Sequence, residues 1–335
     1  MRFLVRIRLA TMVILLLGLV MAVPAFAQTL GPDGAPNPTA SGISERDLLK
    51  QVPRAEGRID IPDVKAAVLI QPAGRTWDYF HEVWLHWGGA AIILGTIATL
   101  GLAYLVMGRL RITAGRSGQK ITRFKAFERF SHWLTAVSFV VLGLTGLNIT
   151  FGKIVLLPLI GPEAFSDISQ VAKYVHNFTS FSFVAGLLLI IAIFFRDNIP
   201  EKVDLDWIKQ GGGFIKGKHA PASRFNPGEK AVYWLSLLAG ISVSVSGFVL
   251  LFPFYGTDIA DMQIAQVVHA VVAVLFVALI LGHIYIGTLG MEGAFEAMGT
   301  GEVDLNWAKE HHDVWLARKL ASEDWQAHPS ATPAE

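Results

Sequence analysis

Residues 264–290 have the sequence IAQVVHAVVAVLFVALILGHIYIGTLG, and this stretch decides the class of fold. It contains no lysine, arginine, aspartate or glutamate. A helix needs about 20 apolar residues to cross the hydrocarbon core of a bilayer, and this run is longer than that. The stretch therefore predicts a transmembrane helix that carries two histidines, His269 and His283.

Four more apolar stretches precede it, and each is long enough to cross a membrane. None has a charged residue in its middle; they are residues 84–107, 131–151, 175–195 and 231–253. The composition agrees, with 53% hydrophobic and only 16% charged residues and a mean hydropathy of +0.47. We therefore predict an all-α membrane protein with five transmembrane helices and exclude a soluble globular protein. The balance of 28 Lys and Arg against 27 Asp and Glu gives no sign of nucleic-acid binding.

The chain begins with the features of a secretory signal peptide, which we place at residues 1–27. A start with three arginines is followed by an apolar run over 9–23 and a small-residue cleavage motif, Ala-Phe-Ala, at 25–27. The alternative is an uncleaved first helix, but the apolar run is short and ends at Pro24. Residues 28–83 then form a periplasmic N-terminal segment that is too short to bury a core of its own.

The distribution of basic residues between the spans predicts the orientation of the chain. The loops over 108–129 and 196–230 are rich in Lys and Arg, whereas the loop between the last two spans has neither. Basic loops stay in the cytoplasm, so these two loops face inward. The mature N-terminus then lies in the periplasm of a bacterial inner membrane, and the tail of residues 291–335 lies in the cytoplasm. The signal peptide predicts the same orientation independently.

Four of the ten histidines lie in the spans, and their depths match in two pairs. His269 and His283 project within about 40° of one another and are separated by about 21 Å along one helix axis. Given the orientation, His132 begins its span at the inner level and His176 begins its span at the outer level. His132 therefore pairs with His283, and His176 pairs with His269.

Two histidines on facing helices at one depth are typical of the axial ligands of a low-spin haem b. Ligation on both faces of the iron leaves electron transfer rather than oxygen chemistry. The chain has no cysteine, which excludes covalent haem attachment, cysteine-ligated iron–sulfur clusters and disulfides. We predict two haem b groups in a four-helix cytochrome b core over residues 130–290, with the helix at 84–107 additional to it.

The remaining histidines and the span glycines give weaker signals. His81 and His86 lie at the outer start of the first span, and we expect both to be interfacial. His311 and His312 lie in the inner tail, where we expect surface positions rather than ligands. Five span glycines offer room for a porphyrin or for plain helix packing, and no specific role is assigned to them; they are Gly143, Gly146, Gly186, Gly247 and Gly282.

Several short stretches resemble the gamma subunit of respiratory formate dehydrogenase, the membrane cytochrome b subunit of that complex. They are Phe130-Ser131-His132-Trp133, Lys173-Tyr174-Val175-His176-Asn177, Arg196-Asp197-Asn198-Ile199-Pro200, Asn226-Pro227-Gly228-Glu229-Lys230, Val268-His269-Ala270, Gly282-His283-Ile284-Tyr285 and Trp307-Ala308-Lys309-Glu310-His311-His312. The resemblance covers about residues 120–320, and the extra span and exported segment are similar to the longer bacterial members. It implies that the four paired histidines are the haem ligands, in the pairing given above.

The resemblance also implies a quinone site at the inner haem, formed by Asn226, Gly228 and Glu229. The family pattern is Asn-x-Gly-Gln, so Glu229 departs from it. A carboxylate there would exchange quinone protons or change the affinity for quinone. A helix-capping role competes with this one and is compatible with it, because Asn226, Pro227 and Glu229 fit the N-cap, N1 and N3 positions of the fourth span.

By this resemblance the chain is the electron-transfer and quinone-reducing subunit of an oxidoreductase complex. The catalytic (alpha) subunit would oxidise formate, the iron–sulfur (beta) subunit would pass on the electrons, and menaquinone or ubiquinone would accept them. No residue here is identified as catalytic, and no site for formate, molybdenum or tungsten is found in the sequence. The cytochrome b subunit of a nickel–iron hydrogenase fits the histidine spacing too, while a transporter and a non-redox membrane anchor are alternatives of other classes.

Overall fold

The computed structural model describes residues 77, 79–213, 220–253, 255–322 and 328–329. The predicted signal peptide and most of the predicted periplasmic segment lie outside these residues. The chain divides into two units, and all described residues belong to the second, Gln71–Glu335. Within the described part of this unit, 5 helices are long and apolar enough to cross a membrane. The predicted all-α membrane fold is confirmed.

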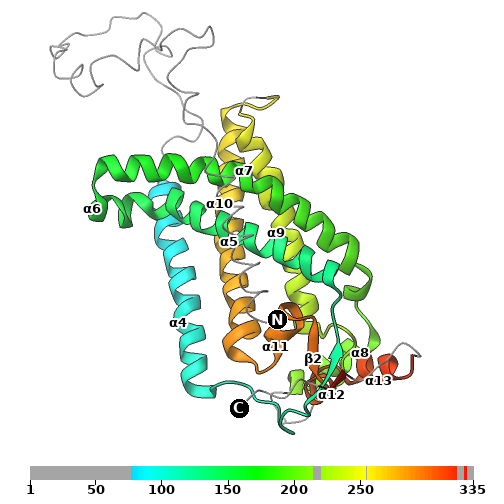
Figure 1. Cartoon of the computed structure of the whole chain (residues 1–335). Helices are drawn as coiled ribbons and strands as arrows, with labels where there is room; N and C mark the ends of the chain where they lie inside the picture. Colours follow the sequence, from blue (N-terminus) through cyan, green and yellow to red (C-terminus); the bar gives the residue numbers. More distant parts are fainter. Residues whose placement is uncertain (1–76, 78, 214–219, 254, 323–327, 330–335) are drawn as a thin grey trace, which may run out of the picture. The chain divides into compact units, whose positions relative to one another are not determined.

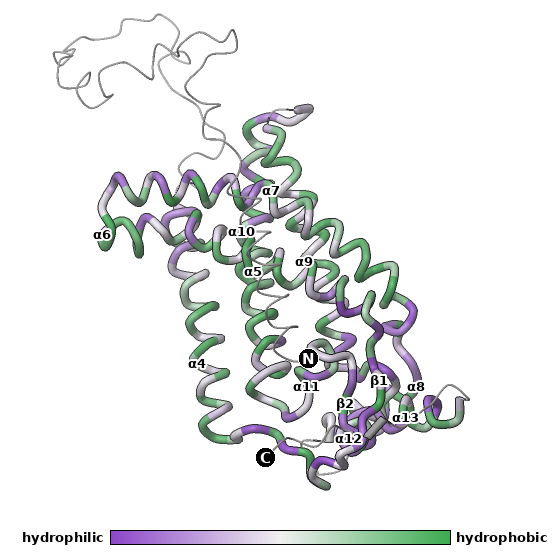
Figure 2. Tube along the Cα trace, in the orientation of Figure 1, coloured by the Kyte–Doolittle hydropathy of each residue, from purple (hydrophilic) through white to green (hydrophobic). Residues whose placement is uncertain are grey.

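The first span consists of a π-helix followed by an α-helix, the last consists of an α-helix followed by a short π-helix, and the three between them are α-helices. Their bounds are η2 (Phe80–Gly88) with α4 (Gly89–Met107), α5 (Ala126–Val155), α7 (Pro162–Phe194), α9 (Pro227–Leu251), and α10 (Ile259–Tyr285) with η5 (Ile286–Gly290). Figure 2 shows mostly hydrophobic residues along them, but the first turns of α7 are hydrophilic. The helix α7 begins at Pro162, but the predicted apolar stretch starts only at residue 175, because hydropathy does not mark the hydrophilic first turns.

Short polar signals begin and end these helices. The side chain of Asn226 caps α9 by accepting a hydrogen bond from the Glu229 N–H, and Pro227 occupies the first turn. Asp258 caps α10 in the same way. The helix α4 ends at Met107, and the residue that follows, Gly108, has a φ of 66°, which lies in the region that favours glycine. The spans are therefore delimited by local chemistry as well as by hydropathy.

The helices pack in neighbouring pairs (Figure 1). The helices α5 and α7, joined by α6 (Leu157–Ile160), run side by side, and α9 packs on α10, which also contacts α4. Lipid tails are as apolar as the side chains of the spans, so the hydrophobic effect does not drive helices together within a membrane. Helices associate there through close packing, which small residues at the contact permit. An added Cβ at Gly186 of α7 would lie 2.5 Å from the Thr135 hydroxyl oxygen of α5 and 3.0 Å from the Thr135 Cα. Gly186 is therefore a packing residue.

A region of polar segments covers one end of these helices. We call it the cap; it comprises the described residues of 108–125, 196–226 and 291–329. Its sheet has the order β2-β1-β3, with β1 (Gln119–Thr122) antiparallel to both β2 (Glu302–Asp304) and β3 (His328–Pro329). Its helices are η3 (Arg196–Asn198), α8 (Lys202–Lys209), η4 (Gly211–Gly213), α11 (Ala294–Gly299), α12 (Leu305–His311) and α13 (Asp313–Leu320).

The cap has a hydrophobic core of its own. Ile121 of β1, Val303 of β2 and Trp307 of α12 are each at most 2% exposed. The guanidinium groups of Arg123 and Arg224 lie 5.0 and 5.1 Å from the centroid of the Phe124 ring. The sequence indicated only a tail over residues 291–335, so the packing of residues 291–320 into this core is a finding of the structure.

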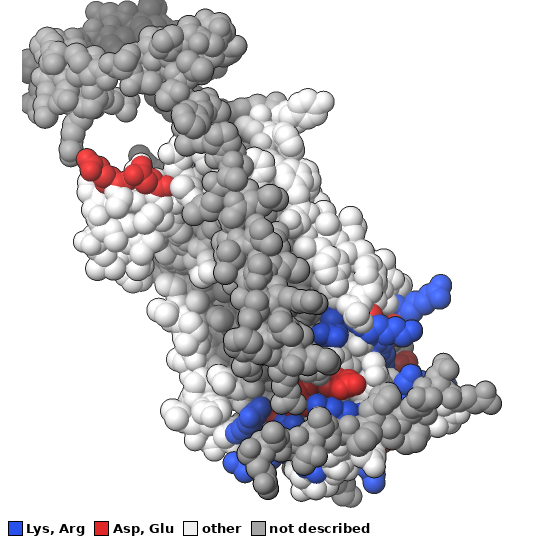
Figure 3. Space-filling model, viewed as in Figure 1, with Lys and Arg blue, Asp and Glu red and all other residues white. Residues whose placement is uncertain are grey.

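Charged side chains gather at the end that carries the cap (Figure 3). Several of them are paired inside it: Lys230 is 4% exposed, and its Nζ donates to Asp204 Oδ2 at 2.8 Å. Arg224 donates to Glu128 at 2.7 Å and also to Asp197. These pairs join the cap to the first turns of α5 and α9, so the cap holds those helix ends in place.

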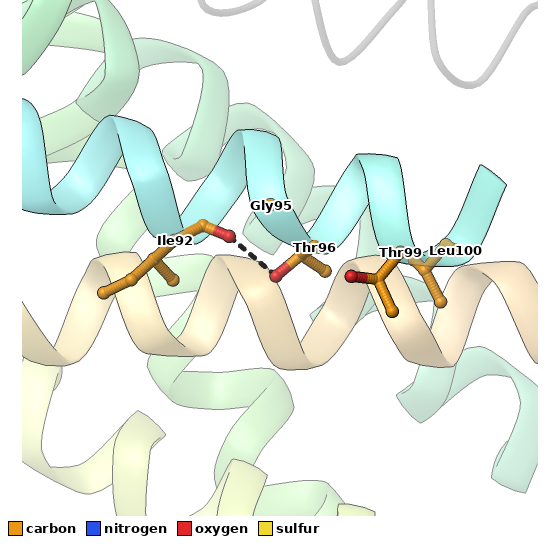
Figure 4. Close-up of a pocket in the computed structure, with 5 residues that line it drawn as sticks. All are labelled: Ile92, Gly95, Thr96, Thr99 and Leu100. Atoms are coloured by element: carbon orange, nitrogen blue, oxygen red, sulfur yellow. Dashed lines mark hydrogen bonds between the residues drawn. The ribbon is translucent and has the colours of Figure 1, made fainter. Parts of the chain in front are cut away.

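A groove lies on the mainly apolar surface of α4 (Figure 4). Its lining residues all belong to α4; they are Ile92, Gly95, Thr96, Thr99 and Leu100. The Thr96 hydroxyl donates to the Ile92 carbonyl at 2.8 Å, which satisfies it within the helix. The groove contains none of the predicted site residues, and its apolar character is that of a surface that faces lipid.

Candidate functional site

His132 and His283, which we call the inner pair after the level predicted for them, lie between α5 and α10. The two ring centroids are 6.1 Å apart, and the ring planes make an angle of 56°. The Nδ1 atom of His132 is buried and has no hydrogen-bond partner among the described residues. Because a buried polar atom without a partner costs about 1–3 kcal/mol, this ring is suited to a group held between the two helices.

The outer pair consists of His176 in α7 and His269 in α10, with ring centroids 6.2 Å apart. Each ring has a hydroxyl partner: Thr145 Oγ1 lies 2.9 Å from Nδ1 of His176, and Ser246 Oγ lies 3.1 Å from Nδ1 of His269. Both hydroxyls donate their hydrogen to a carbonyl four residues earlier in their own helix, so they accept from the rings. The proton therefore sits on Nδ1, which leaves the Nε2 lone pair for a metal.

Each of these hydroxyl residues is followed by a glycine that faces the same ring. An added Cβ at Gly146 would lie 3.4 Å from the His176 ring, and one at Gly247 would lie 3.2 Å from the His269 ring. The outer pair is thus backed by a Thr-Gly dipeptide in α5 and a Ser-Gly dipeptide in α9. Sequence reasoning missed this role, although a hydroxyl–glycine dipeptide in two apolar spans was a signal that could have found it.

The ring separations fit one metal ion between the members of each pair. With a metal–nitrogen bond of about 2.0 Å and about 1.15 Å from the nitrogen to the ring centroid, two opposed imidazoles have centroids about 6.3 Å apart. The observed separations are 6.1 and 6.2 Å. Imidazole suits iron as a donor. The four histidines therefore fit two bis-imidazole iron sites, and their role as ligands stays a prediction.

Comparison with known proteins places this site in a family. The model of the prokaryotic cytochrome b561 family matches residues 123–301, which is more than half of the chain. The chain belongs to this family. The matched segment includes α5, α7, α9 and α10, and with them all four paired histidines. The protein is therefore a multi-pass membrane cytochrome that binds haem b and transfers electrons.

Relatives of this cytochrome b561 family member have more specific names. The formate dehydrogenase cytochrome b556(fdo) subunit of Escherichia coli (strain K12) is 28% identical over 199 residues, which are 58% of this chain and 91% of the relative. The formate dehydrogenase cytochrome b556 subunit of Haemophilus influenzae is 28% identical over 209 residues, 61% of this chain and 85% of the relative. The nitrate-inducible cytochrome b556(Fdn) subunit of E. coli is 26% identical over 201 residues, 58% and 89% of the two chains. The resemblance stated from the sequence is confirmed.

An aromatic layer separates the two histidine pairs of this cytochrome. Phe139 of α5 has its ring centroid 4.5 Å from that of Phe276 of α10 and 6.2 Å from that of Phe183 of α7. Each of these phenylalanines follows a site histidine of its own helix by about two turns, and Phe276 lies midway between His269 and His283. Apolar side chains therefore fill the space between the two histidine pairs.

The residues predicted to contact quinone lie where α9 meets the cap. Glu229 accepts from the Asn226 N–H and donates its own N–H to Asn226 Oδ1, both at 3.0 Å, so the predicted capping role is confirmed. Arg123 donates to Glu229 Oε1 at 2.9 Å, and His312 Nε2 lies 3.7 Å from Glu229 Oε2. The Glu229 side chain is nevertheless 35% exposed, which leaves part of it accessible. Its contact with quinone, and that of Gly228, stays a prediction.

The surface position expected for His312 is wrong. The residue is 1% exposed, its ring lies 5.2 Å from that of Trp307, and its Nδ1 donates to the Ser223 carbonyl at 2.9 Å. Burial, together with the positive charge of Arg123, lowers the pKa of His312 to about 3, although Glu229 opposes this shift. The ring is therefore neutral near pH 7. Its carbonyl partner is 89 residues away in the chain, so no local pattern indicated the burial.

Proposed function

We propose that this cytochrome is the di-haem b membrane subunit of a formate dehydrogenase complex. It would carry electrons from a periplasmic catalytic and iron–sulfur module across the inner membrane to quinone. The observation that carries the proposal is the presence of two histidine pairs, each spaced for one iron, in a chain whose relatives are named formate dehydrogenase cytochrome b556 subunits. Haem b held between two imidazoles accepts and releases single electrons and has no open position for oxygen.

In this proposal α10 supplies one ligand to each haem. His269 and His283 are separated by about 21 Å along the helix axis, so they define two levels in the membrane. His176 completes the outer site and His132 completes the inner site. The hydroxyls of Thr145 and Ser246 hold the outer rings in the tautomer that offers Nε2 to iron.

The cap is the cytoplasmic end in this proposal. Its support is the Lys and Arg content of the segments over 108–129 and 196–230, since basic segments stay in the cytoplasm. The inner pair lies toward the cap along the chain: His132 is in the second turn of α5, and His283 is near the end of α10. Electrons that arrive at the periplasmic face would thus leave at the cytoplasmic face.

Quinone would be reduced beside the inner pair, at Asn226, Gly228 and Glu229. The capping box and Arg123 fix the Glu229 carboxylate, and its exposed part would face the quinone. Glu229→Gln keeps the shape of the side chain and removes its charge. The expected result is a changed KM for quinone with both haems retained, while Glu163→Gln, at the start of α7, changes neither. An unchanged KM in Glu229→Gln would remove this residue from the quinone site.

The haem assignment is tested by counting haem in the purified chain. A pyridine haemochrome assay should give two b haems per chain, and His132→Ala and His176→Ala should each remove one, with different losses in the reduced-minus-oxidised spectrum. A folded preparation without haem, or loss of the same haem in both variants, would contradict the two-site arrangement.

The electron donor is tested in membranes that contain the whole complex. Formate should reduce both haems, and antibodies against this chain should co-purify the catalytic and iron–sulfur subunits. Reduction by hydrogen but not by formate would instead identify the chain as the cytochrome b subunit of a hydrogenase.

A further inference from the structure

A second cluster of potential metal ligands lies outside the histidine pairs, at the start of the first span. Among the described residues, His81, Glu82 and His86 bring one donor atom each to within 4.8 Å of one another. The rings of His81 and His86 have centroids 5.2 Å apart. We expected both histidines at the interface, but the structure buries His86, which is 6% exposed, and leaves His81 and Glu82 accessible with 41% and 55% of their side chains exposed.

The π-helical backbone of η2 brings the two rings together. In an α-helix, five residues turn through about 500°, which would point the side chains of His81 and His86 about 140° apart. The π-helix closes its hydrogen bonds between residues five apart and so places such residues near one face. The helix is π only over Phe80–Gly88 and α from Gly89 onward. The unusual segment therefore coincides with the cluster, as is frequent for π-helical turns at functional sites.

The hydrogen bonding of His86 leaves a lone pair directed at the cluster. Its Nε2 lies 2.8 Å from the carbonyl oxygen of Thr150 in α5, which can only accept, so Nε2 carries a proton. In the neutral ring Nδ1 is then an acceptor. Two oxygens of Glu82 lie near it, the carbonyl oxygen at 3.3 Å and the carboxylate Oε2 at 3.9 Å, and both can only accept. A cation at this point would accept the lone pairs of Nδ1 and of the carboxylate.

The distances suit a small divalent ion. Two ligand atoms bound about 2.1 Å from a tetrahedral Zn²⁺ lie about 3.4 Å apart. Glu82 Oε1 lies 3.3 Å from His81 Nδ1, and Glu82 Oε2 lies 3.9 Å from His86 Nδ1. Two imidazoles and one carboxylate are a common zinc ligand set, with water in the fourth position, and the exposure of His81 and Glu82 leaves that position open to solvent.

We propose that His81, Glu82 and His86 form a binding site for a divalent transition-metal ion such as Zn²⁺, separate from the haem sites. The bond from His86 to the Thr150 carbonyl orients the ring, as hydrogen bonds behind a metal ligand generally do. All three ligands lie in η2, so the ion would hold the π-helical turn, while the bond from His86 to the Thr150 carbonyl connects this turn to the end of α5.

The test is zinc binding by the full chain, purified with its haem in detergent and without a polyhistidine tag. After treatment with a chelator, each protein is dialysed against a series of Zn²⁺ concentrations, and bound zinc and iron are quantified by mass spectrometry. The variants are His81→Ala and Glu82→Gln, whose exposed side chains can change without disturbing the packing. Glu163→Gln is the matched control, since it removes one exposed carboxylate from the first turn of α7.

The wild type and Glu163→Gln should each bind one zinc ion per chain. His81→Ala and Glu82→Gln should bind this ion at least about tenfold more weakly. Iron content should be equal in all four proteins, so the result does not depend on the haem assignment. Equal zinc binding in all four would place the ion elsewhere and overturn the proposal. No zinc bound by the wild type would overturn it too.

Discussion

Replacement of Ser246 by alanine should weaken the outer haem site and leave the inner site intact. The side chain of Ser246 is 5% exposed, and its Oγ accepts from His269 Nδ1 at 3.1 Å while donating to the Ser242 carbonyl at 2.7 Å. Alanine removes this acceptor and adds no volume. The ring of His269 then loses its hydroxyl partner and keeps only the backbone carbonyl of Val243, so it is held less firmly in the orientation that presents Nε2 to iron.

The size of the effect follows from the loss of one hydrogen bond to the ring. Such a bond contributes about 0.5–1.5 kcal/mol, and about 1.4 kcal/mol corresponds to a factor of ten in affinity. Mutation of the partner of a metal-ligating histidine typically lowers metal affinity about 10- to 100-fold. The two estimates meet at a haem affinity of the outer site that is about tenfold lower in Ser246→Ala.

Haem transfer to an excess of a haem-scavenging apoprotein measures this loss. Ser244→Ala is the matched control, because Ser244 lies on the same helix and donates only to the Gly240 carbonyl at 2.6 Å. One of the two haems should leave Ser246→Ala faster than it leaves the wild type. The spectrum of the haem that leaves should match that of the haem missing from His176→Ala. Retention of both haems at the wild-type rate, or an equal effect of Ser244→Ala, would refute the orienting role of this hydroxyl.

Three further predictions concern packing and buried charge. Gly186→Ala brings a Cβ to within 2.5 Å of a hydroxyl on α5 and should lower the unfolding free energy by about 1–3 kcal/mol. Gly101→Ala is the control, because an added Cβ there meets no atom within 4 Å. Equal denaturant midpoints for the two variants would contradict the packing role of Gly186. Lys230→Met leaves the buried Asp204 carboxylate without its partner at 2.8 Å and should lower the unfolding free energy by about 3–5 kcal/mol. Adding Asp204→Asn should recover part of this stability in the same denaturation assay. If it recovers none, the loss of the ion pair is not the cause. Because the pKa of His312 is lowered from 6.5 to about 3, the unfolded chain takes up a proton that the folded chain refuses, so stability should fall as the pH drops from 6.5 to 3, by at most about 1.4 kcal/mol per pH unit. His312→Gln should flatten this dependence in thermal melts over a pH series, and an unchanged slope would show that the buried ring is not its source.

The levels of the paired histidines were predictable because two simple signals set them. The period of an α-helix places His269 and His283 near one face of α10. The basic loops predict the orientation of the chain and thereby the levels of His132 and His176. The structure brings the rings together in those two combinations, 6.1 and 6.2 Å apart. No knowledge of the neighbouring side chains was needed for this part of the site.

The surroundings of the histidines were not predictable in the same way. His312 was expected at the surface and His86 at the interface, yet both are buried against carbonyl groups 89 and 64 residues away. The hydroxyls of Thr145 and Ser246 received no role, because hydroxyls within apolar spans usually bond to their own helix. These two do so as well, and only the approach of another helix adds the histidine as a second partner.

The sequence by itself determined the five spans, the capping of the fourth by Asn226, and the pairing of histidines by depth. Each of these depends on hydropathy, charge or period within one segment, and a segment retains them whatever its neighbours are. Only the tertiary structure decided how the cap folds around Trp307, which hydroxyl and glycine face each ring of the outer pair, and that a π-helical turn aligns His81 with His86. Those features depend on contacts between segments far apart in the chain and on the local register of the backbone, and hydropathy carries no information about either.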